Sequence, residues 1–177
     1  MINGLELSGD RMEKLGFKDA MSLVPTSVSV LRVTSSVTNP QVVAVTISSL
    51  ISLSVAHGEE EIMFALKNNS YFGQRLLEEK VFSISLLNSG QDNLARKYGS
   101  SANLQPDLDL NEEESWVAVD NFFYLRNSLL VLFCELTDHD VRKHSTLYFG
   151  KILSLNGSVT SSPLVYQNRH FKSVIST

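Results

Sequence analysis

The sequence of 177 residues is long enough to bury a core without metals or disulfides and short enough to form one domain. Hydrophobic residues make up 43% and charged residues 19%, which excludes a disordered chain, and no apolar run is long enough to span a membrane. The formal net charge is −4 and the 15 Lys and Arg residues are dispersed, which argues against nucleic acid as the main partner.

The single cysteine and the first residues of the chain indicate a cytoplasmic protein. Cys134 lies in the apolar run 129–136, a context typical of an inert core thiol, and a lone cysteine has no partner for a disulfide or a zinc site. Residues 1–10 lack the basic start and the apolar stretch of a secretory signal. We therefore expect no disulfide and no metal centre.

The first half of the chain mixes strands with short helices. A loose helical spacing covers residues 10–23 and ends before Pro25. Alternating or continuous apolar runs predict strands at 27–34, 41–47, 61–66 and 81–87, the second apolar enough to be buried on both faces. Helices are predicted at 71–80 and at 89–98, with Ser89 as the N-cap of the latter.

The second half reads as strands only, after a polar and acidic loop over residues 99–115. Strands are predicted at 116–119, 129–136, 147–155 and 164–166. Strands and helices do not alternate regularly, which argues against a doubly wound sheet. The pattern favours a β-rich α+β fold, a closed or nearly closed barrel with a few flanking helices, as a single domain over residues 1–177.

The usual catalytic motifs are missing from this sequence. It has no glycine-rich phosphate loop and no G-x-S-x-G nucleophile elbow. His139 lies between Asp138 and Asp140, but neighbours on a strand point to opposite faces, so a solvated turn is the better interpretation. His57 is expected in an exposed turn, and the acidic runs 59–61 and 112–114 are typical of solvated surface.

A hydroxyl-rich stretch over residues 46–54 is the remaining candidate site. Small side chains let a ligand approach the main chain, where hydroxyls and N–H groups supply hydrogen bonds. Lys67 to Ser70, Arg96 and Lys97 could complete a basic pocket for a phosphate-bearing ligand. On spacing alone, a sheet edge with ordinary polar side chains is the favoured interpretation of the stretch.

The order of these segments resembles the flavin reductase-like, FMN-binding split-barrel family, the small reductase components of two-component monooxygenases. The resemblance is carried by residues 17–21 with Pro25-Thr26, by 45–54 as a T-x-S-S-x-x-S-x-S segment, by 68–70, by 82–87 followed by 91–98, and by 166–171 as Y-x-x-R-x-[YF]. It implies a split β-barrel and covers nearly the whole chain.

The resemblance implies an NAD(P)H-dependent flavin reductase that supplies reduced FMN or FAD to a partner monooxygenase, with NADH or NADPH as the hydride donor. It also implies a homodimer with one flavin per subunit near the interface. The alternative is a flavin-binding protein of the same fold without efficient reductase activity. A pyridoxamine phosphate oxidase-like relative and a heme-binding barrel with His144 or His170 as ligand rank lower.

Carried over onto this sequence, the family's flavin contacts fall on fourteen residues. In chain order they are Thr46, Ile47, Ser48, Ser49, Ser52, Leu53, Lys67, Asn68, Ser70, Phe72, Arg96, Lys97, Tyr166 and Arg169. The resemblance implies that Arg96 and Lys97 meet the phosphate, and that Asn68, Ser70 and Phe72 close one side of the site.

The chain departs from the family at the G-D-H motif, which places a histidine near the nicotinamide. Alignment on Thr146 and Gly150 puts Lys143-His144-Ser145 there, so Ser145 takes the histidine position and His144 lies one residue early. On a strand, this slip would turn His144 to the opposite face, whereas a local turn or bulge would return it to the site. His144 and Ser145 are therefore the candidate catalytic residues.

Overall fold

A computed structural model of the chain describes residues 14–33, 42–99, 115–158 and 161–174, and strands dominate these ranges. The helices are α1 (Phe17–Ser22), α2 (Tyr71–Glu79) and α3 (Asp92–Gly99). The strands of the first half are β1 (Thr26–Ser27), β2 (Ser29–Val33), β3 (Ala44–Ile47), β4 (Ile51–Ser54), β5 (Glu61–Lys67) and β6 (Val81–Leu86). Those of the second half are β7 (Trp116–Val119), β8 (Phe122–Leu125), β9 (Leu130–Val141), β10 (Ser145–Gly157), β11 (Leu164–Gln167) and β12 (His170–Ser173).

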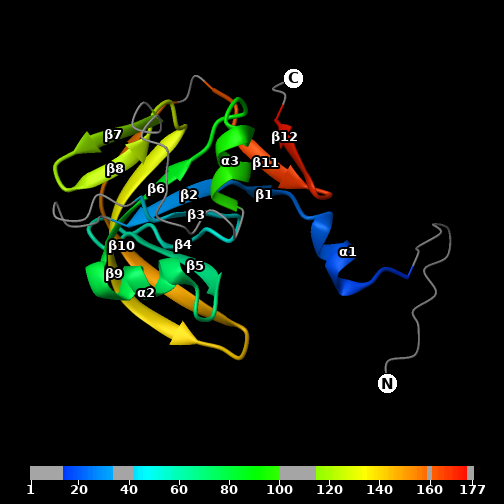
Figure 1. Ribbon diagram of the computed structural model, residues 1–177, viewed down its shortest axis with the longest axis horizontal. Helices are drawn as coiled ribbons and strands as arrows, with labels where there is room; N and C mark the ends of the chain where they lie inside the picture. Colours follow the sequence, from blue (N-terminus) through cyan, green and yellow to red (C-terminus); the bar gives the residue numbers. More distant parts are fainter. Residues whose placement is uncertain (1–13, 34–41, 100–114, 159–160, 175–177) are drawn as a thin grey trace.

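Seven of these strands form one antiparallel sheet in the order β3-β2-β6-β9-β10-β5-β4. Its two end strands, β3 and β4, are joined by residues 48–50 alone, a linker that spans about 10 Å when extended. The sheet must therefore curl until its ends approach each other, and β3 also contacts β5. The prediction of a β-rich α+β fold with few flanking helices is confirmed (Figure 1).

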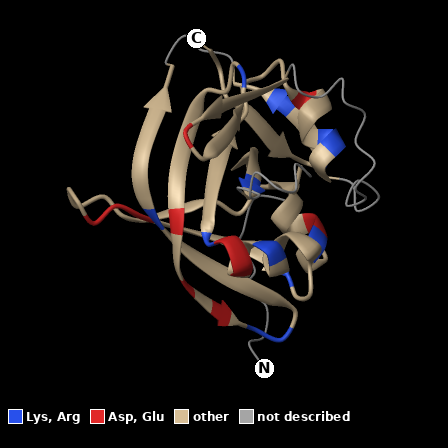
Figure 2. Cartoon of the chain, turned by 60° about the vertical axis from the view of Figure 1, so that its left-hand side comes forward, with Lys and Arg blue, Asp and Glu red and all other residues tan. Residues whose placement is uncertain are grey.

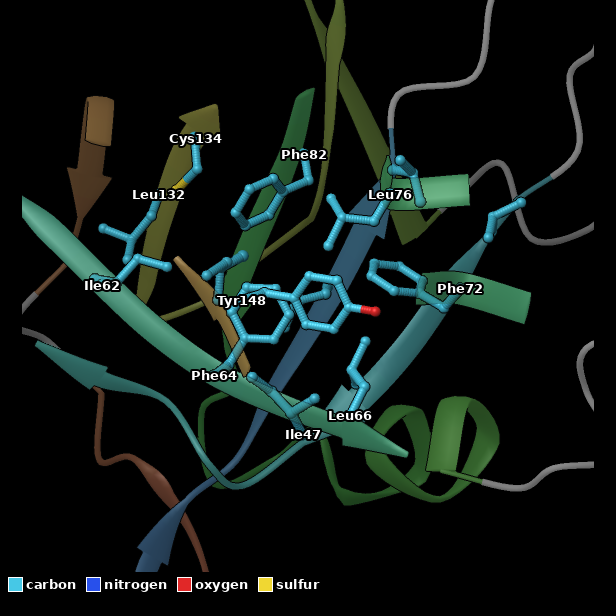
Figure 3. Close-up of a cluster of buried hydrophobic side chains, with 14 residues drawn as sticks. Ile47, Ile62, Phe64, Leu66, Phe72, Leu76, Phe82, Leu132, Cys134 and Tyr148 are labelled. Carbon is cyan, nitrogen blue, oxygen red and sulfur yellow. The ribbon is translucent and has the colours of Figure 1, made fainter. Parts of the chain in front are cut away.

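The curled sheet encloses an aromatic core. Phe64 and Tyr148 stack with ring centroids 5.5 Å apart, and Phe82 meets Phe64 edge-on at 5.6 Å. Figure 3 shows these rings together with aliphatic residues from several strands. Cys134 lies fully buried in the same cluster, and desolvation raises the pKa of its thiol to about 12. The interpretation of Cys134 as an inert core thiol is confirmed, because a thiol with this pKa stays protonated at neutral pH.

A second apolar cluster lies on the other face of β2, beneath α3 and the β7–β8 hairpin. It includes Val28, Val30, Tyr98 and Trp116. Every residue of β2 is consequently buried, whereas β3 is half-buried in its middle because it ends the sheet. Ile47 of β3 nevertheless belongs to the aromatic core and Ala44 to the second cluster, so both faces of the strand within 41–47 are covered, as predicted, although its two middle residues are only half-buried.

Arg32 is a buried cation within this second cluster. Its guanidinium lies 3.8 Å from the Phe123 ring centroid and 4.6 Å from that of Trp116, and only 5% of the residue is exposed. Desolvation lowers its pKa to about 10. Two aromatic faces thus offset part of the cost of burying this charge.

Some local predictions are wrong. The strand β9 continues through His139 to Val141, so His139 lies in a strand rather than a turn, although its side chain is exposed as expected. Beyond Glu135, β9 no longer pairs with β6 and pairs with β10 alone, so this part of the strand is largely exposed and lacks the buried alternation that would mark a strand in the sequence. Ser89 does not cap α3, which begins three residues later, with the Gln91 carbonyl accepting from the Ala95 amide.

The structure adds β4, β8, β12 and the short β1, which the sequence patterns did not predict as strands. In the described part of the predicted helix 10–23, only α1 is helical. His57 lies in an exposed turn, as expected. The acidic run 112–114 and most of the predicted loop 99–115 lie outside the described residues. Within the described ranges, no helix combines the length and the apolar composition that a membrane crossing needs.

Gly150 on β10 allows the sheet to pack tightly around Phe82. A Cβ atom at Gly150 would lie 2.8 Å from Phe82 Cζ and 3.2 Å from Ile62 Cδ1. We expect Gly150→Ala to lower the free energy of unfolding by about 1–3 kcal/mol, because overpacked cores must shift their side chains. Urea unfolding measures the change. The control is Gly157→Ala on the same strand, where the nearest atom is 3.4 Å away, and an equal effect of both substitutions would contradict this explanation.

Candidate functional site

A cleft of about 400 Å³ opens where the end of β3, the C-terminal half of α3 and the β11–β12 hairpin meet. This volume is in the range of small-molecule sites. The residues that line it are Val28, Thr46, Ile47, Ser48, Ala95, Arg96, Gly99, Tyr166, Arg169 and Phe171. Six of the predicted flavin contacts are thus brought together, from segments more than a hundred residues apart in the chain: Thr46, Ile47, Ser48, Arg96, Tyr166 and Arg169.

Hydrogen bonds fix the walls of this cleft to one another. Thr46 Oγ1 donates to the Ala95 carbonyl at 2.8 Å and so ties α3 to β3. On the opposite wall, Thr26 pairs with Tyr166 in the β1–β11 ladder, and the Val28 amide donates to the Leu164 carbonyl at 3.2 Å. The cleft is therefore formed by elements that hold a fixed spacing without a ligand.

Two arginines give the cleft its charge. Arg96, in the last turn of α3, lies 4.9 Å from the Phe171 ring centroid and 3.5 Å from the Asp92 carboxylate. Arg169, in the turn between β11 and β12, pairs with Asp19 of α1. None of the described residues that line the cleft is acidic. Planar guanidinium groups beside hydroxyls and aromatic rings are suited to a phosphate carried on a larger organic ligand.

The backbone at Arg169 is unusual for a residue with a long side chain. Asn168 and Arg169 form the two-residue hairpin turn, with φ of 50° and 65°. Turns of this kind favour glycine at the second position because a Cβ atom is strained at positive φ. The side chain at this position therefore carries a conformational cost that glycine would avoid.

The hydroxyl-rich stretch leads from the cleft toward β5. Ser49 Oγ accepts from the Ala65 amide at 3.1 Å and donates to the Ala65 carbonyl at 3.2 Å, so this side chain replaces a strand partner where β4 begins. Ser52 and Leu53 follow on β4, the end strand of the sheet, and both are exposed. The stretch thus presents an exposed edge that continues from the cleft.

The predicted residues that follow β5 do not line the cleft. Asn68 Oδ1 accepts from Thr146 Oγ1 at 2.9 Å, and Asn68 Nδ2 donates to the Arg142 carbonyl at 2.8 Å, so Asn68 ties the β9–β10 hairpin to β5. Ser70 caps α2 by accepting from the Gly73 amide at 3.1 Å. Phe72 is 1% exposed and packs in the aromatic core, which leaves its side chain no surface for a ligand.

Lys67 and Lys97 also lie apart from the cleft lining. Lys67 is exposed at the end of β5, where it pairs with Ser145 of β10. The Lys97 ammonium lies 5.7 Å from the ring centroid of the neighbouring Tyr98. Of the two adjacent cations of α3, only Arg96 is among the described residues that line the cleft.

His144 lies in the turn just before β10, and its side chain is exposed. Because this residue precedes the strand, the alternation of side chains along β10 does not determine which way it points. Ser145 is the half-buried first residue of β10. This hairpin tip lies at the opposite end of the molecule from α3 and β12 in both Figure 1 and Figure 2. The candidate catalytic residues are therefore not among the described residues that line the cleft.

Sequence reasoning did not select Val28, Ala95, Gly99 and Phe171, which complete the cleft. Ala95 and Gly99 are four residues apart on one helix, so they share a face, and small residues on the face toward β3 were a detectable signal. Asp19 was also missed, because nothing local in the sequence connects it with Arg169. No cluster of three or more potential metal ligands occurs among the described residues.

Lys and Arg residues do not gather on one surface in the described part of the chain. Figure 2 shows them dispersed over helices and strands and interleaved with acidic residues. Of the salt bridges, most join neighbours within a helix or hairpin. A face for a polyanion such as nucleic acid would need a continuous basic surface, so the arginine pair of the cleft points to a small anionic group instead.

Comparisons with known proteins agree with this geometry. A family model described as "Flavin reductase like domain" matches residues 21–174. Among solved structures, the NADH:FAD oxidoreductase SgcE6 of Streptomyces globisporus aligns with a TM-score of 0.78 and 18% identity, over 90% of this chain and 92% of that one. No curated protein matches the sequence.

Two further solved structures align over a similar share of the chain. BorF, the flavin reductase component of a bacterial two-component tryptophan halogenase, aligns with a TM-score of 0.79 and 20% identity, over 90% of this chain and 97% of that one. The styrene monooxygenase flavin reductase of Pseudomonas putida aligns with a TM-score of 0.77 and 18% identity, over 92% of this chain and 99% of that one. These likenesses confirm the fold that the resemblance in the sequence implied.

Proposed function

The chain belongs to the flavin reductase-like domain family and is therefore an oxidoreductase, and from this premise we propose that it is an NAD(P)H-dependent flavin reductase. The cleft with Arg96 and Arg169 is the observation that carries the proposal, because it offers a phosphate-bearing flavin two cations beside hydroxyls and aromatic rings. The reduced FMN or FAD would then diffuse to a partner monooxygenase in the cytoplasm. BorF and the styrene monooxygenase reductase, both described as flavin reductases of larger systems, support such a partner.

The chemistry of the lining residues fits a flavin nucleotide. Arg96 and Arg169 would hold the phosphate by charge-assisted hydrogen bonds. Thr46, Ile47 and Ser48 would follow the ribityl chain, and the exposed edge with Ser49, Ser52 and Leu53 would support the ring. Lys67, Asn68, Ser70, Phe72 and Lys97 are proposed as contacts only through the resemblance, because in one protomer they lie apart from the cleft lining.

When bound, the flavin supplies a ring that accepts a hydride from a reduced nicotinamide, and the protein supplies orientation and the exclusion of water. Ser49, next to the cleft residue Ser48, bonds Ala65 of β5, and two residues further along that strand, at its end, Lys67 pairs with Ser145. His144, beside Ser145, would orient the nicotinamide at that end. The phosphate end of the site is thus assigned to the cleft, and the hydride-transfer end to the strand end with Lys67 and Ser145.

We include a homodimer in the proposal. The end strand β4 exposes Ile51 at 50% and Leu53 at 46%, and Val55 just after it is 84% exposed. Apolar side chains in a row on an unpaired edge strand are typical of a surface that a partner covers. A second subunit at this edge would enclose the site from the open side.

The function is tested by an absorbance spectrum of the purified protein with FMN and with FAD, followed by NADH or NADPH without oxygen. Bound flavin that bleaches at about one turnover per second or faster supports the reductase. Bound flavin that stays oxidised with both nucleotides would instead establish the alternative, a flavin-binding protein without efficient reduction. The one-residue displacement of His144 is the observation that favours that alternative.

If His144 orients the nicotinamide, His144→Ala should lower kcat about tenfold or more while flavin affinity stays within about twofold. The matched control is His139→Ala, since His139 is also exposed and lies on the same hairpin. Stopped-flow measurement of flavin bleaching separates hydride transfer from binding. Equal rates for both variants would remove His144 from the mechanism.

A further inference from the structure

The ion pair between Asp19 and Arg169 joins α1 to the mouth of the cleft. The two residues are 150 positions apart in the chain, and their side chains are 56% and 54% exposed. Arg169 lines the cleft, whereas Asp19 belongs to a helix that lies beside the body of the molecule in Figure 1. The ion pair between Asp19 and Arg169 therefore both involves a cleft residue and holds α1 in place.

Few other interactions hold α1 in place. None of its residues is buried. Besides the Asp19 pair, the Asn168 amide donates to the Ser22 carbonyl at 2.5 Å, and Gln167 Nε2 donates to the Leu23 carbonyl at 2.9 Å. All three contacts reach the β11–β12 turn that carries Arg169. The position of α1 thus depends on the same turn that supplies a cation to the cleft.

The charges at the cleft mouth balance before a ligand arrives. Arg96 has Asp92 at 3.5 Å, and Arg169 has Asp19. Arg96 keeps a second support, since its guanidinium lies over the Phe171 ring. The Arg169 guanidinium is paired with Asp19, so a phosphate that takes two hydrogen bonds from this guanidinium must displace or share with that carboxylate.

We propose that Asp19 competes with the ligand's phosphate for Arg169 and so sets how strongly the cleft discriminates between flavins with and without a phosphate. The inference rests on the proposed function, since it takes the ligand to be a flavin nucleotide. It also makes α1 responsive to the ligand: a phosphate that replaces Asp19 removes one of the three contacts that, among the described residues, join α1 and the adjacent Leu23 to the β11–β12 hairpin. Because coupling between two binding events is reciprocal, loss of the Asp19 contact must favour phosphate binding.

The experiment compares FMN with riboflavin, which has the same ring and no phosphate, on the full-length protein. Asp19→Asn is expected to tighten FMN binding about fivefold at low salt, the upper range for an exposed ion pair, and to leave riboflavin binding unchanged. The control is Asp140→Asn, which removes the same charge from another exposed Asp–Arg pair, with Arg142, on the distant β9–β10 hairpin. This control should change neither affinity.

Hydrogen exchange supplies a second readout. In the unchanged protein, FMN should speed amide exchange in residues 19–24 whereas riboflavin should not. Weaker FMN binding by Asp19→Asn would overturn the proposal, because Asp19 would then position Arg169 for the phosphate. An equal change for FMN and riboflavin would also overturn it. If the unchanged protein binds neither flavin, the proposed function fails and this inference fails with it. If FMN binds tightly and Asp19→Asn does not change its affinity, the inference alone is refuted.

Discussion

Replacement of both Arg96 and Arg169 by glutamine is expected to weaken FMN binding about 100-fold and to change riboflavin binding less than about threefold. Each arginine offers the phosphate a charge-assisted hydrogen bond of about 1.5–3 kcal/mol, and two such bonds at the lower end give about this ratio. Glutamine retains a polar, flexible side chain, so the walls of the cleft keep their shape. Quenching of flavin fluorescence during titration measures both affinities.

The control for this double substitution removes two positive charges elsewhere. Arg126→Gln with Arg142→Gln gives the same net charge, and both residues are exposed and absent from the cleft lining. If it weakens FMN binding as strongly, the overall charge of the protein rather than the cleft determines affinity. If the Arg96 and Arg169 variant loses FMN and riboflavin equally, the arginines shape the cleft and do not bind a phosphate.

The sequence predicted those parts of the fold that local patterns determine. The apolar run at 81–87 became β6 (Val81–Leu86), and the segment 71–80 became α2 (Tyr71–Glu79). Helical spacing identifies α2 because one face of that helix is buried. β6 is buried on both faces, but Ser83 and Ser85 still alternate with its apolar residues, so its pattern remains recognisable. The cleft residues Thr46, Arg96 and Arg169 could be predicted for another reason. They lie in segments whose order resembles a known family, and the structure places them around one cleft.

The parts of the fold and of the site that the sequence did not predict depend on contacts between residues far apart in the chain, which no local pattern contains. Asn68 looked like a free ligand contact, but the register of β5 on β10 brings Thr146 opposite Leu66 and lets Thr146 bond Asn68. The exposed segment around His139 is a strand only because β10 pairs with it. The Asp19–Arg169 pair likewise requires the β1–β11 ladder, which brings residues 26 and 166 together. Each case follows from strand register, which a single sequence does not reveal.

Phe64 is the side chain whose loss should cost the fold most, and it lies on β5, the strand that ends at the proposed nicotinamide end of the site. It is fully buried, stacked on Tyr148 of β10 and in edge contact with Phe82 of β6, so one ring joins β5 to two other strands. We expect Phe64→Ala to lower the free energy of unfolding by about 3–5 kcal/mol, since the ring leaves a cavity that a curled sheet cannot close. Urea unfolding measures this loss.

The control is a Phe→Ala substitution at the surface, which removes a ring without leaving a cavity in the core. Phe17 of α1 is 83% exposed, so Phe17→Ala should change the free energy of unfolding by less than about 0.5 kcal/mol. A loss below about 1.5 kcal/mol for Phe64→Ala would mean that the strands collapse onto the cavity, and the sheet would then be far more deformable than its packing indicates. Because β5 carries Lys67 and β10 begins with Ser145, such a sheet could not hold the proposed nicotinamide end at a fixed distance from the arginines of the cleft.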